Sequence, residues 1–404
     1  MTPEAPLSSV ELFTGAGGLA LGVAKAGFHH QAVVEWNHDA CCSLRDNSAR
    51  LNVMRGWPIF EGDVRDFDFQ PFADRVSLLA AGAPCQPFSL GGKHRGHADD
   101  RNMFPEVFRA VREVLPPAVI VENVKGLLRT SFRPYFNYIL SALSAPEMPA
   151  RSAESWEEHA TRLDAAIKRN RVRGTRYRVS FQLVNAADFG VPQRRERVFI
   201  IAFRDDLDVE WECLKPTHSE DSLLFAKWVD GSYWKEHGLR PQPVPDRFVP
   251  RVQRLRSVFS ELANANVKRW ITVRDALRGL PEPIDYEPHP SIPNHFGNPG
   301  ARAYPGHTGS PWDEPAKTLK AGDHGVPGGE NMLRRDDGSV RYFSVREAAR
   351  LQTFPDDYVF QGAWTEGFRQ LGNAVPVELA RVVASEVRRV LDVTVERRTR
   401  GRVA

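Results

Sequence analysis

The chain of 404 residues lacks any run of about 18 consecutive apolar residues, the length that a membrane-spanning helix needs. Its first 18 residues also lack a basic start followed by an apolar segment, so we expect no signal peptide. Both absences argue against a membrane partner. They favour a protein that stays in the cytoplasm.

Cysteine is scarce as well. The sequence holds four, and no two of them have the Cys-x-x-Cys spacing of a zinc site: Cys41, Cys42, Cys85 and Cys213. This pattern argues against a disulfide scaffold and fits a reducing compartment. We therefore expect no metal ion.

A large excess of one charge is also missing. The net charge of +3 is too small to indicate a nucleic-acid partner by itself. Between Arg240 and Arg278, however, nine Arg or Lys residues stand against three acids. On charge alone, a solvated surface explains this block as well as a nucleic-acid-binding surface does.

Short apolar runs alternate with helical patterns through the first 200 residues. The runs are Ser9–Phe13, Gln31–Trp36, Val76–Gly82, Ala118–Val124, Val179–Val184 and Val198–Phe203. Between two of them, Met103–Leu115 has the apolar spacing of a helix. Strands that alternate with helices predict an α/β fold, with a mostly parallel, Rossmann-like sheet and helices on both faces.

The composition changes after Arg204, where prolines multiply and the alternation stops until about residue 315. Helical patterns return at Phe343, and Val377–Leu391 reads as an amphipathic helix. We therefore expect a first domain over residues 1–204 and a smaller irregular domain over residues 205–342. A closing segment over residues 343–404 would return to the first domain, and Glu396–Arg402 would fray.

The first expected strand leads into a glycine-rich turn with Phe13, Gly15, Gly17 and Gly18, where a helix begins. Glycines allow a tight turn and close approach of a ligand, and the start of a helix favours polar or anionic groups. On this turn alone, three interpretations stay equally open. They are a nicotinamide or flavin enzyme, a methyltransferase, and a turn without a ligand.

Residues at the next strand ends suit a nucleoside. Glu35 follows Gly17 by 18 residues and can accept hydrogen bonds from two ribose hydroxyls. Trp36 beside it can stack on an adenine ring. Asp63, followed by Val64, suits an adenine amino group, or else it caps a helix or a turn.

The strand Val76–Gly82 runs into a Pro84-Cys85-Gln86-Pro87 loop. A free cysteine is most often a small buried apolar residue, but flanking prolines fix a rigid loop and indicate a soft nucleophile. Glu122 directly follows another apolar strand, where a buried carboxylate is costly unless it has a partner. It would end at the same sheet edge as Cys85, or else it is a strand-end acid in solvent.

Arg195 and Arg197 enter the last expected strand, and residues two apart in a strand share one face. They indicate either an exposed edge strand or a fork that holds a base carbonyl, a phosphate or the catalytic acid.

Taken in order, these motifs resemble the DNA cytosine-5 methyltransferase family, in its bacterial restriction–modification form. The matching segments are Phe13-x-Gly15-x-Gly17-Gly18, Pro84-Cys85-Gln86, Glu122-Asn123-Val124, Gln193-Arg194-Arg195-x-Arg197, Arg350–Asp356 and Gly372-Asn373-Ala374-Val375-Pro376. The resemblance covers almost the whole chain apart from about residues 145–175 and 205–315. It implies the methyltransferase form of the Rossmann-like fold, with residues 205–342 as a target-recognition domain that reads duplex DNA.

The resemblance also implies roles for single residues. Cys85 would attack ring carbon 6 of a flipped cytosine, and Glu122 would stabilise charge near ring nitrogen 3. Arg195 would contact the base carbonyl and Arg197 would support the loop. S-adenosylmethionine would be the methyl donor, held by Phe13, Gly15, Gly17, Gly18, Glu35, Trp36, Asp63, Val64, Pro84, Asn373 and Val375.

Three other functions stay open. A tRNA cytosine-5 methyltransferase is disfavoured by the long variable block, because that branch lacks a large target domain. An NAD-dependent oxidoreductase would leave Cys85 and Glu122 unexplained, and both residues argue against a catalytically inactive DNA-binding module. We expect a monomer that acts on double-stranded DNA at the nucleoid, with a cognate restriction endonuclease as a genetic partner.

Overall fold

The computed structural model describes residues 7–84, 102–257, 267–321 and 329–403, and Cys85 lies outside these ranges. Within them, contacts divide the chain into two compact units. The first unit combines residues 1–184, 196–214 and 357–404, and the second combines residues 185–195 and 215–356. No helix in the described part of the chain is long and apolar enough to cross a membrane.

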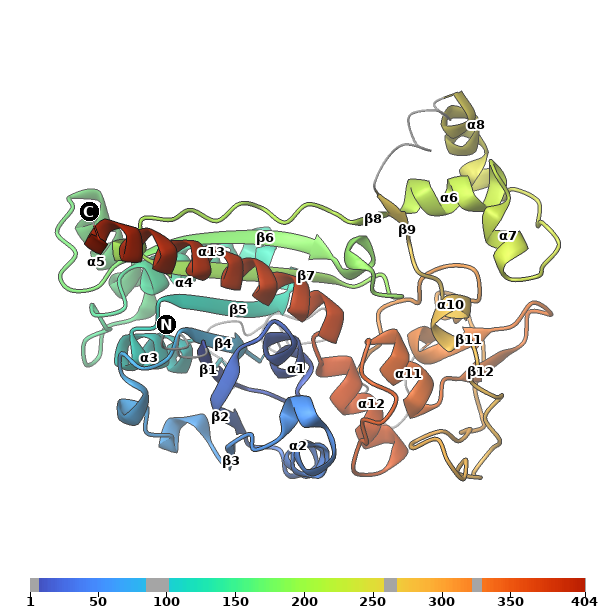
Figure 1. Ribbon diagram of the computed structural model, residues 1–404, viewed down its shortest axis with the longest axis horizontal. Coiled ribbons are helices and arrows are strands. Elements are labelled where there is room, and N and C mark those ends of the chain that lie inside the picture. Colours follow the sequence, from blue (N-terminus) through green and yellow to red (C-terminus); the bar gives the residue numbers. More distant parts are fainter. Residues whose placement is uncertain (1–6, 85–101, 258–266, 322–328, 404) are drawn as a thin grey trace. The chain divides into compact units, whose positions relative to one another are not determined.

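The first unit is built on a seven-stranded sheet in the order β3-β2-β1-β4-β5-β7-β6 (Figure 1). Neighbouring strands from β3 to β5 run parallel, whereas β7 runs antiparallel to β5. The strands are β1 (Ser8–Leu12), β2 (His29–Glu35), β3 (Ile59–Glu61), β4 (Leu78–Gly82), β5 (Ala118–Val124), β6 (Tyr177–Asn185) and β7 (Glu196–Arg204). The predicted α/β class and mostly parallel sheet are confirmed.

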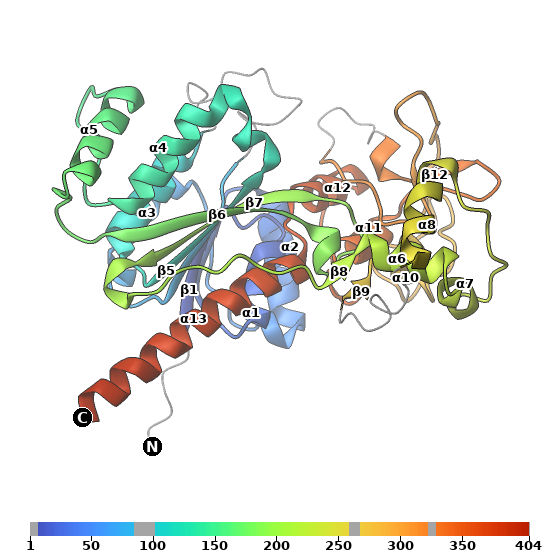
Figure 2. The same cartoon turned by 90° about the horizontal axis from the view of Figure 1, so that it is seen from above.

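Helices cover both faces of this sheet. Figure 2 shows α3 and α4 on one side and α1 and α13 on the other. The helices of the unit are α1 (Gly18–Lys25), α2 (His38–Arg50), α3 (Phe104–Val114), α4 (Arg133–Ser144), α5 (Trp156–Lys168), α12 (Trp364–Asn373) and α13 (Val377–Val403). The face toward α3 and α4 forms one large core, in which alternate residues of β1 and β2 pack on both helices.

Glycines let α13 pack closely on α1. A Cβ atom added to Gly22 would lie 2.3 Å from the Cβ of Ala380, and one added to Gly27 would lie 1.9 Å from the guanidinium of Arg388. Arg388 in turn donates to the carbonyl of Gly27 over 2.7 Å. The residues Glu396–Arg402, which we expected to fray, belong to α13.

The second unit has less regular structure, as its composition predicts. Its strands form a three-stranded sheet and a two-stranded sheet: β10 (Ser310–Pro311), β11 (Met332–Arg334) and β12 (Val340–Tyr342), and β8 (His218–Ser219) and β9 (Lys268–Arg269). Its helices are α6 (Glu220–Trp228), α7 (Ser232–Glu236), α8 (Val249–Ser257), α10 (Val273–Leu277) and α11 (Val345–Leu351). Tyr233, Trp234 and Trp270 form the centre of one small core.

The two units do not follow the three segments that we expected. Residues 185–195 belong to the second unit, and so does α11. Hydrogen bonds explain the first difference, because the amide of Arg194 donates to the carbonyl of Ala316 over 2.8 Å and the amide of Ala316 donates to the carbonyl of Pro192 over 2.9 Å. The chain therefore enters the second unit before residue 205 and returns to the first over residues 196–214. After residues 215–356 of the second unit, the last stretch with α12 and α13 belongs to the first unit again.

Glu11 is an acid in the middle of β1, and it is fully buried. Burial raises the pKa of Glu11 well above its usual range, although the backbone of Ala20 opposes this shift. The folded protein therefore holds the Glu11 proton more tightly than the unfolded chain does. The contribution of Glu11 to stability is therefore lost as the pH rises from the unfolded pKa of about 4.3 through the higher folded pKa.

Replacing Glu11 by glutamine should remove this pH dependence. We expect the free energy of unfolding of Glu11→Gln, minus that of the wild type, to grow as the pH rises from 4 to 8, as measured by urea unfolding. Glu154→Gln is a control of opposite sign in a lower pH window: Arg162 lowers the pKa of Glu154 to about 2, so its difference from the wild type should fall between about pH 2 and the unfolded pKa of about 4.3 and change little above about pH 5. A difference for Glu11→Gln that does not change with pH would contradict the expectation.

Candidate active site

The first unit gathers most of the predicted site at one edge of its sheet. The order β2-β1-β4 reverses the direction in which the chain adds strands, and ligands of open α/β sheets bind at the carboxyl ends of strands on either side of such a point. Glu35 ends β2, and Phe13 and Pro84 follow the ends of β1 and β4. Glu122 lies near the carboxyl end of β5. The sheet therefore brings these four predicted positions to one edge.

The turn after β1 depends on left-handed backbone. Gly15 has a φ of 55° and Gly17 a φ of 80°, and Phe13 takes a φ of 58°, which is rare for a bulky residue. A Cβ on Gly17 would lie 2.9 Å from a methyl group of Leu44. At Gly15, by contrast, no described atom lies within 4 Å of an added Cβ. The turn thus leaves room at Gly15 for a group to approach the backbone.

Backbone amides hold the carboxylate of Glu35 in place. Gly15 donates to Oε2 over 2.7 Å, and Asn37 donates to Oε1 over 2.8 Å. Burial raises the pKa of Glu35, while these hydrogen bonds and the charge of Arg369 partly offset the effect. Each oxygen keeps a second lone pair, so the carboxylate can accept two further hydrogen bonds.

Trp36 and Asp63 differ in their surroundings. The ring of Trp36 is 74% exposed, which leaves a face for stacking. The carboxylate of Asp63 accepts from the amide and the guanidinium of Arg65, and these bonds lower the pKa of Asp63. Asp63 thus caps the short helix Val64–Asp66, with Val64 in the core. Its contact with an adenine stays a prediction.

The return segment between α12 and α13 packs on the glycine turn. A Cβ on Gly18 would lie 2.2 Å from the carbonyl oxygen of Val375, so glycine is required there. Val375 is buried, while Asn373 at the end of α12 is exposed. The hydroxyl of Tyr358 also donates to the carbonyl of Ala16 over 2.6 Å. Sequence reasoning missed Tyr358, which lies just beyond the motif that ends at Asp356.

Glu122 forms a nearly buried ion pair with Arg197. Its carboxylate lies 2.8 Å from Nε of Arg197, and the two side chains are 9% and 11% exposed. The pairing follows from the register of β5 and β7, which places Glu122 opposite Phe199 and Val124 opposite Arg197. Of the alternatives that the sequence left open, the structure favours an arginine that holds the acid.

Asn123 fixes the loop that leads to Cys85. Its side-chain amide donates to the carbonyl of Ala83 over 3.2 Å, and Glu122 pairs with Gly82 in the neighbouring strand. Asn123 is 1% exposed. The sequence places Asn123 beside the acid but does not predict this positioning role, because its hydrogen-bond partner Ala83 follows the neighbouring strand β4.

Arg195 corrects one expectation. We predicted that Arg195 and Arg197 share one face of a strand, but β7 begins at Glu196 and only Arg197 lies in it. Arg195 belongs to the second unit, where it is fully buried and donates from its guanidinium to the carbonyl of Leu319 over 3.1 Å. Its carbonyl accepts from the amide of Ala186 over 2.8 Å instead of continuing the strand.

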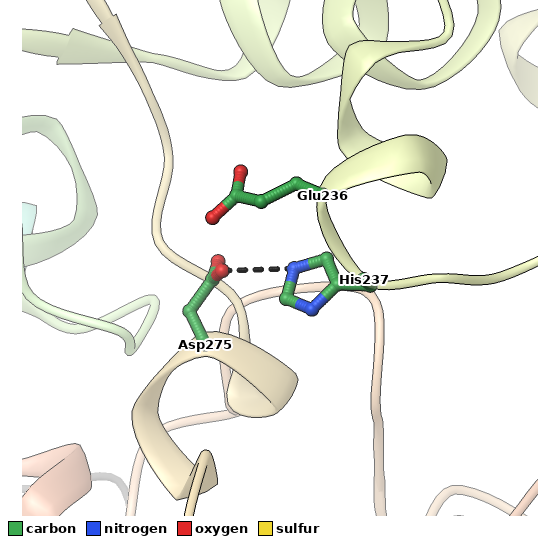
Figure 3. Close-up of side chains that lie close together, drawn as sticks. All are labelled: Glu236, His237 and Asp275. Carbon is green, nitrogen blue, oxygen red and sulfur yellow. Dashed lines mark ion pairs between the residues drawn. The ribbon is translucent and has the colours of Figure 1, made fainter.

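In the second unit, Glu236, His237 and Asp275 approach one another closely enough to hold a metal ion (Figure 3). Arginines already balance both acids, however. Arg269 lies 2.8 Å from Glu236 and 2.7 Å from Asp275, and Arg278 donates to Nδ1 of His237 over 3.3 Å. Nδ1 is therefore an acceptor, and Nε2 lies 3.0 Å from a carboxylate oxygen of Asp275. The cluster reads as an ion-pair network.

The strand order, the glycine turn and the acids at the strand ends define an α/β protein with the arrangement typical of nucleoside-binding sites. Comparison with known proteins makes the class definite. A model of the family described as C-5 cytosine-specific DNA methylase matches residues 7–146 and 158–389. The chain belongs to this family, and it is a DNA cytosine-5 methyltransferase.

Curated relatives are similar to this chain over most of their own length. The Type II methyltransferase M.Eco47II of Escherichia coli is 33% identical over 390 residues, which cover 95% of this chain and 79% of the relative. The Type II methyltransferase M.PspPI of Psychrobacter sp. (strain TA137) is 31% identical over 391 residues, which cover 96% and 81%.

Solved structures share the fold at lower identity. The S. pombe Dnmt2 methyltransferase matches with a TM-score of 0.52 and 18% identity, and the match covers 96% of this chain and 98% of that one. The Entamoeba histolytica methyltransferase EhMeth matches with a TM-score of 0.56 and 12% identity, covering 95% and 98%.

The ion pair between Glu122 and Arg197 should behave as a coupled unit. We expect Arg197→Gln to lower the free energy of unfolding by roughly 3–5 kcal/mol, because it removes the cation that balances a nearly buried carboxylate. The double variant with Glu122→Gln should be less destabilised, since it buries no charge. Urea unfolding of these two variants and of the Glu122→Gln single variant checks this.

Lys125→Gln provides the control. It breaks the exposed ion pair with Glu196, in which the two side chains are 57% and 47% exposed, and should cost less than about 1 kcal/mol. If the double variant lost the sum of the two single losses, Glu122 and Arg197 would not be coupled.

Proposed function

We propose that this chain is the modification enzyme of a bacterial restriction–modification system and methylates one cytosine within a short duplex sequence. The names of the relatives as Type II methyltransferases support this role. We propose that it acts as a monomer at the nucleoid, with a cognate restriction endonuclease encoded beside it. The second unit, which overlaps the expected residues 205–342, would recognise the target.

We propose that S-adenosylmethionine binds at the glycine turn of the first unit. The open space at Gly15 and the fixed carboxylate of Glu35 fit a nucleoside with a charged tail. Glu35 would accept from the ribose hydroxyls, Trp36 would stack on the adenine, and Asn373 and Val375 would border the site. When bound, this cofactor supplies an electrophilic methyl group.

The ion pair of Glu122 and Arg197 is the observation that carries the proposed mechanism. In the register of the sheet, Glu122 lies beside Gly82, three residues before Cys85. We propose that the Cys85 thiolate adds to ring carbon 6 of a flipped cytosine, which makes ring carbon 5 nucleophilic. Glu122, oriented by Arg197, would stabilise the charge that develops at ring nitrogen 3.

Two further steps complete the cycle. Arg195 would hold the base carbonyl with its guanidinium, a planar group suited to such contacts. After ring carbon 5 has gained its substituent, loss of its proton and departure of the Cys85 sulfur restore the aromatic ring. Asn123 would act as a positioning residue, because its hydrogen bond fixes Ala83 in the loop before Cys85.

Trp36→Ala should weaken cofactor binding with little effect on folding. Loss of aromatic stacking costs about 1–3 kcal/mol per base, so we expect roughly tenfold weaker binding of S-adenosylhomocysteine in calorimetry. Tyr286→Ala is the matched control, since Tyr286 is 73% exposed in the second unit. Equal affinity of Trp36→Ala and the wild type would place the adenine elsewhere.

The covalent step is tested in a host that lacks cytosine methylation. The wild type should mark one short sequence with 5-methylcytosine across the genome, and Cys85→Ala should leave no mark while still binding S-adenosylhomocysteine. DNA with 5-fluorocytosine should form a denaturation-resistant adduct with the wild type, because fluorine does not leave as a proton does.

Methylation by Cys85→Ala would refute the nucleophile. A wild type that binds cofactor but leaves the genome unmarked would instead refute the proposed DNA target, and tRNA would be assayed next.

A further inference from the structure

A second cysteine of the first unit lies beside a histidine and an acid that the mechanism does not use. Sγ of Cys42 is 3.5 Å from Nε2 of His38, one helical turn earlier in α2. Nδ1 of His38 is 2.7 Å from Oε1 of Glu61, which ends β3. The three groups thus form a chain from thiol to imidazole to carboxylate.

The carboxylate at the end of this chain is ionised. Hydrogen bonds from His38 and Arg45 lower the pKa of Glu61. An ionised carboxylate only accepts hydrogen bonds, so Nδ1 of His38 carries the proton that joins them. Nε2 then presents its lone pair to the Cys42 thiol, which is the tautomer that a general base requires.

The other described cysteines have different surroundings. Cys41, next to Cys42 in α2, is buried, and its Sγ donates to the carbonyl of Glu35 over 3.4 Å. Burial raises the pKa of Cys41 to about 12, so its thiol stays protonated. Cys213 is more exposed than Cys42. A comparison of Cys42 with Cys213 therefore separates the effect of a neighbouring base on reactivity from the effect of exposure.

We propose that Cys42, with His38 as its base and Glu61 orienting His38, is a reactive thiol that takes up soft alkylating electrophiles. With iodoacetamide, a bond forms between Sγ and the methylene carbon while the carbon–iodine bond breaks. Iodide leaves with the electron pair of that bond. The thiol proton passes to Nε2 of His38 and from there to solvent.

This modification site is separate from Cys85 and does not depend on the proposed function. The alkylation rate of a thiol depends on its thiolate fraction and on access to the sulfur, so a base within hydrogen-bond distance can make a less exposed thiol react faster than a more exposed one. Because His38 is exposed, an electrophile can approach the sulfur from the solvent side.

The test measures initial alkylation rates of single cysteines with iodoacetamide at pH 7 by peptide mass spectrometry. The full-length chain carries Cys85→Ser, which removes the thiol proposed to act on DNA. We expect Cys42 to react about tenfold faster than Cys213, which is less than the roughly hundredfold at the low end of general base assistance, and Cys41 to react slowest. His38→Gln and Glu61→Gln should each bring Cys42 to within about twofold of Cys213.

Arg50→Gln is the matched control on the same helix, since it removes the ion pair of Arg50 with Asp46 at 3.2 Å and leaves the three groups intact. It should not change the Cys42 rate. The proposal is overturned if Cys42 reacts no faster than Cys213, or if both His38→Gln and Glu61→Gln keep the wild-type rate. Circular dichroism of each variant excludes unfolding as the cause of a change, and Cys41 serves as an internal reporter, because it becomes reactive if α2 opens.

Discussion

Three glycines, which have no side chain, allow the segment before α13 and α13 itself to pack closely against α1 and the turn that follows it. Gly18 and Gly22 lie in α1 and meet backbone or Cβ atoms of α13 or of the segment before it at distances that exclude a Cβ atom, and Gly27, two residues beyond α1, has a φ of 91° and lies against Arg388. The first unit is assembled from three separate stretches of sequence, so this packing joins its last stretch to its first. The same contact sets the carbonyl of Val375 against Gly18, beside the turn where we place the cofactor. Fold closure and site formation therefore depend on one interface.

Three acids of the sheet are stabilised in three different ways, and each way suits a different role. Backbone amides hold Glu35, a guanidinium holds Glu122, and burial keeps the proton on Glu11. A carboxylate held by amides keeps lone pairs for hydroxyl donors, which suits a ribose. A carboxylate held by arginine is fixed in direction beside the strand that leads to Cys85. An acid that stays protonated adds no charge to the core, and so it can lie within β1 without a cation.

Local sequence predicted much of the first unit. The expected run Ala118–Val124 coincides with β5, and the expected helix Met103–Leu115 differs from α3 by one residue at each end. Apolar periodicity sets such elements, so it can be read without contacts. The short strand β3 was missed because Ile59–Glu61 offers only three residues to any pattern.

The candidate site was predictable only in part. Residue types and their order indicated Glu35 and Glu122, because a carboxylate at the end of an apolar strand stands out. Their partners are another matter: the amides of Gly15 and Asn37 bind Glu35, which periodicity does not predict, and Arg197 binds Glu122, which the sequence offered only as one of several alternatives. Tyr358 shows the same limit, since 342 positions separate it from the carbonyl that it binds. The arginine motif predicted that Arg195 lies in the same strand as Arg197, but β7 begins at Glu196. Hydrogen bonds from Arg194 and Arg195 to residues 316–319 hold this segment in the second unit instead.

The basic block of the second unit shows how far a charge count can mislead. Six of its nine cations form ion pairs, mostly with acids that lie outside the counted window: Arg247, Arg251, Arg254, Arg269, Arg274 and Arg278 pair with acids among Glu220, Asp221, Glu236, Asp275, Asp313, Glu314 and Asp336. Many of these pairs are half-buried, as Arg274 and Asp313 are, with side chains 20% and 19% exposed. A guanidinium bound in this way stiffens a region that has few strands and short helices. It would release fewer counterions on meeting a phosphate than a solvated cation would. These ion pairs help to hold the second unit together, so fewer of the nine cations than the sequence suggests are left to contact the duplex that we propose it recognises.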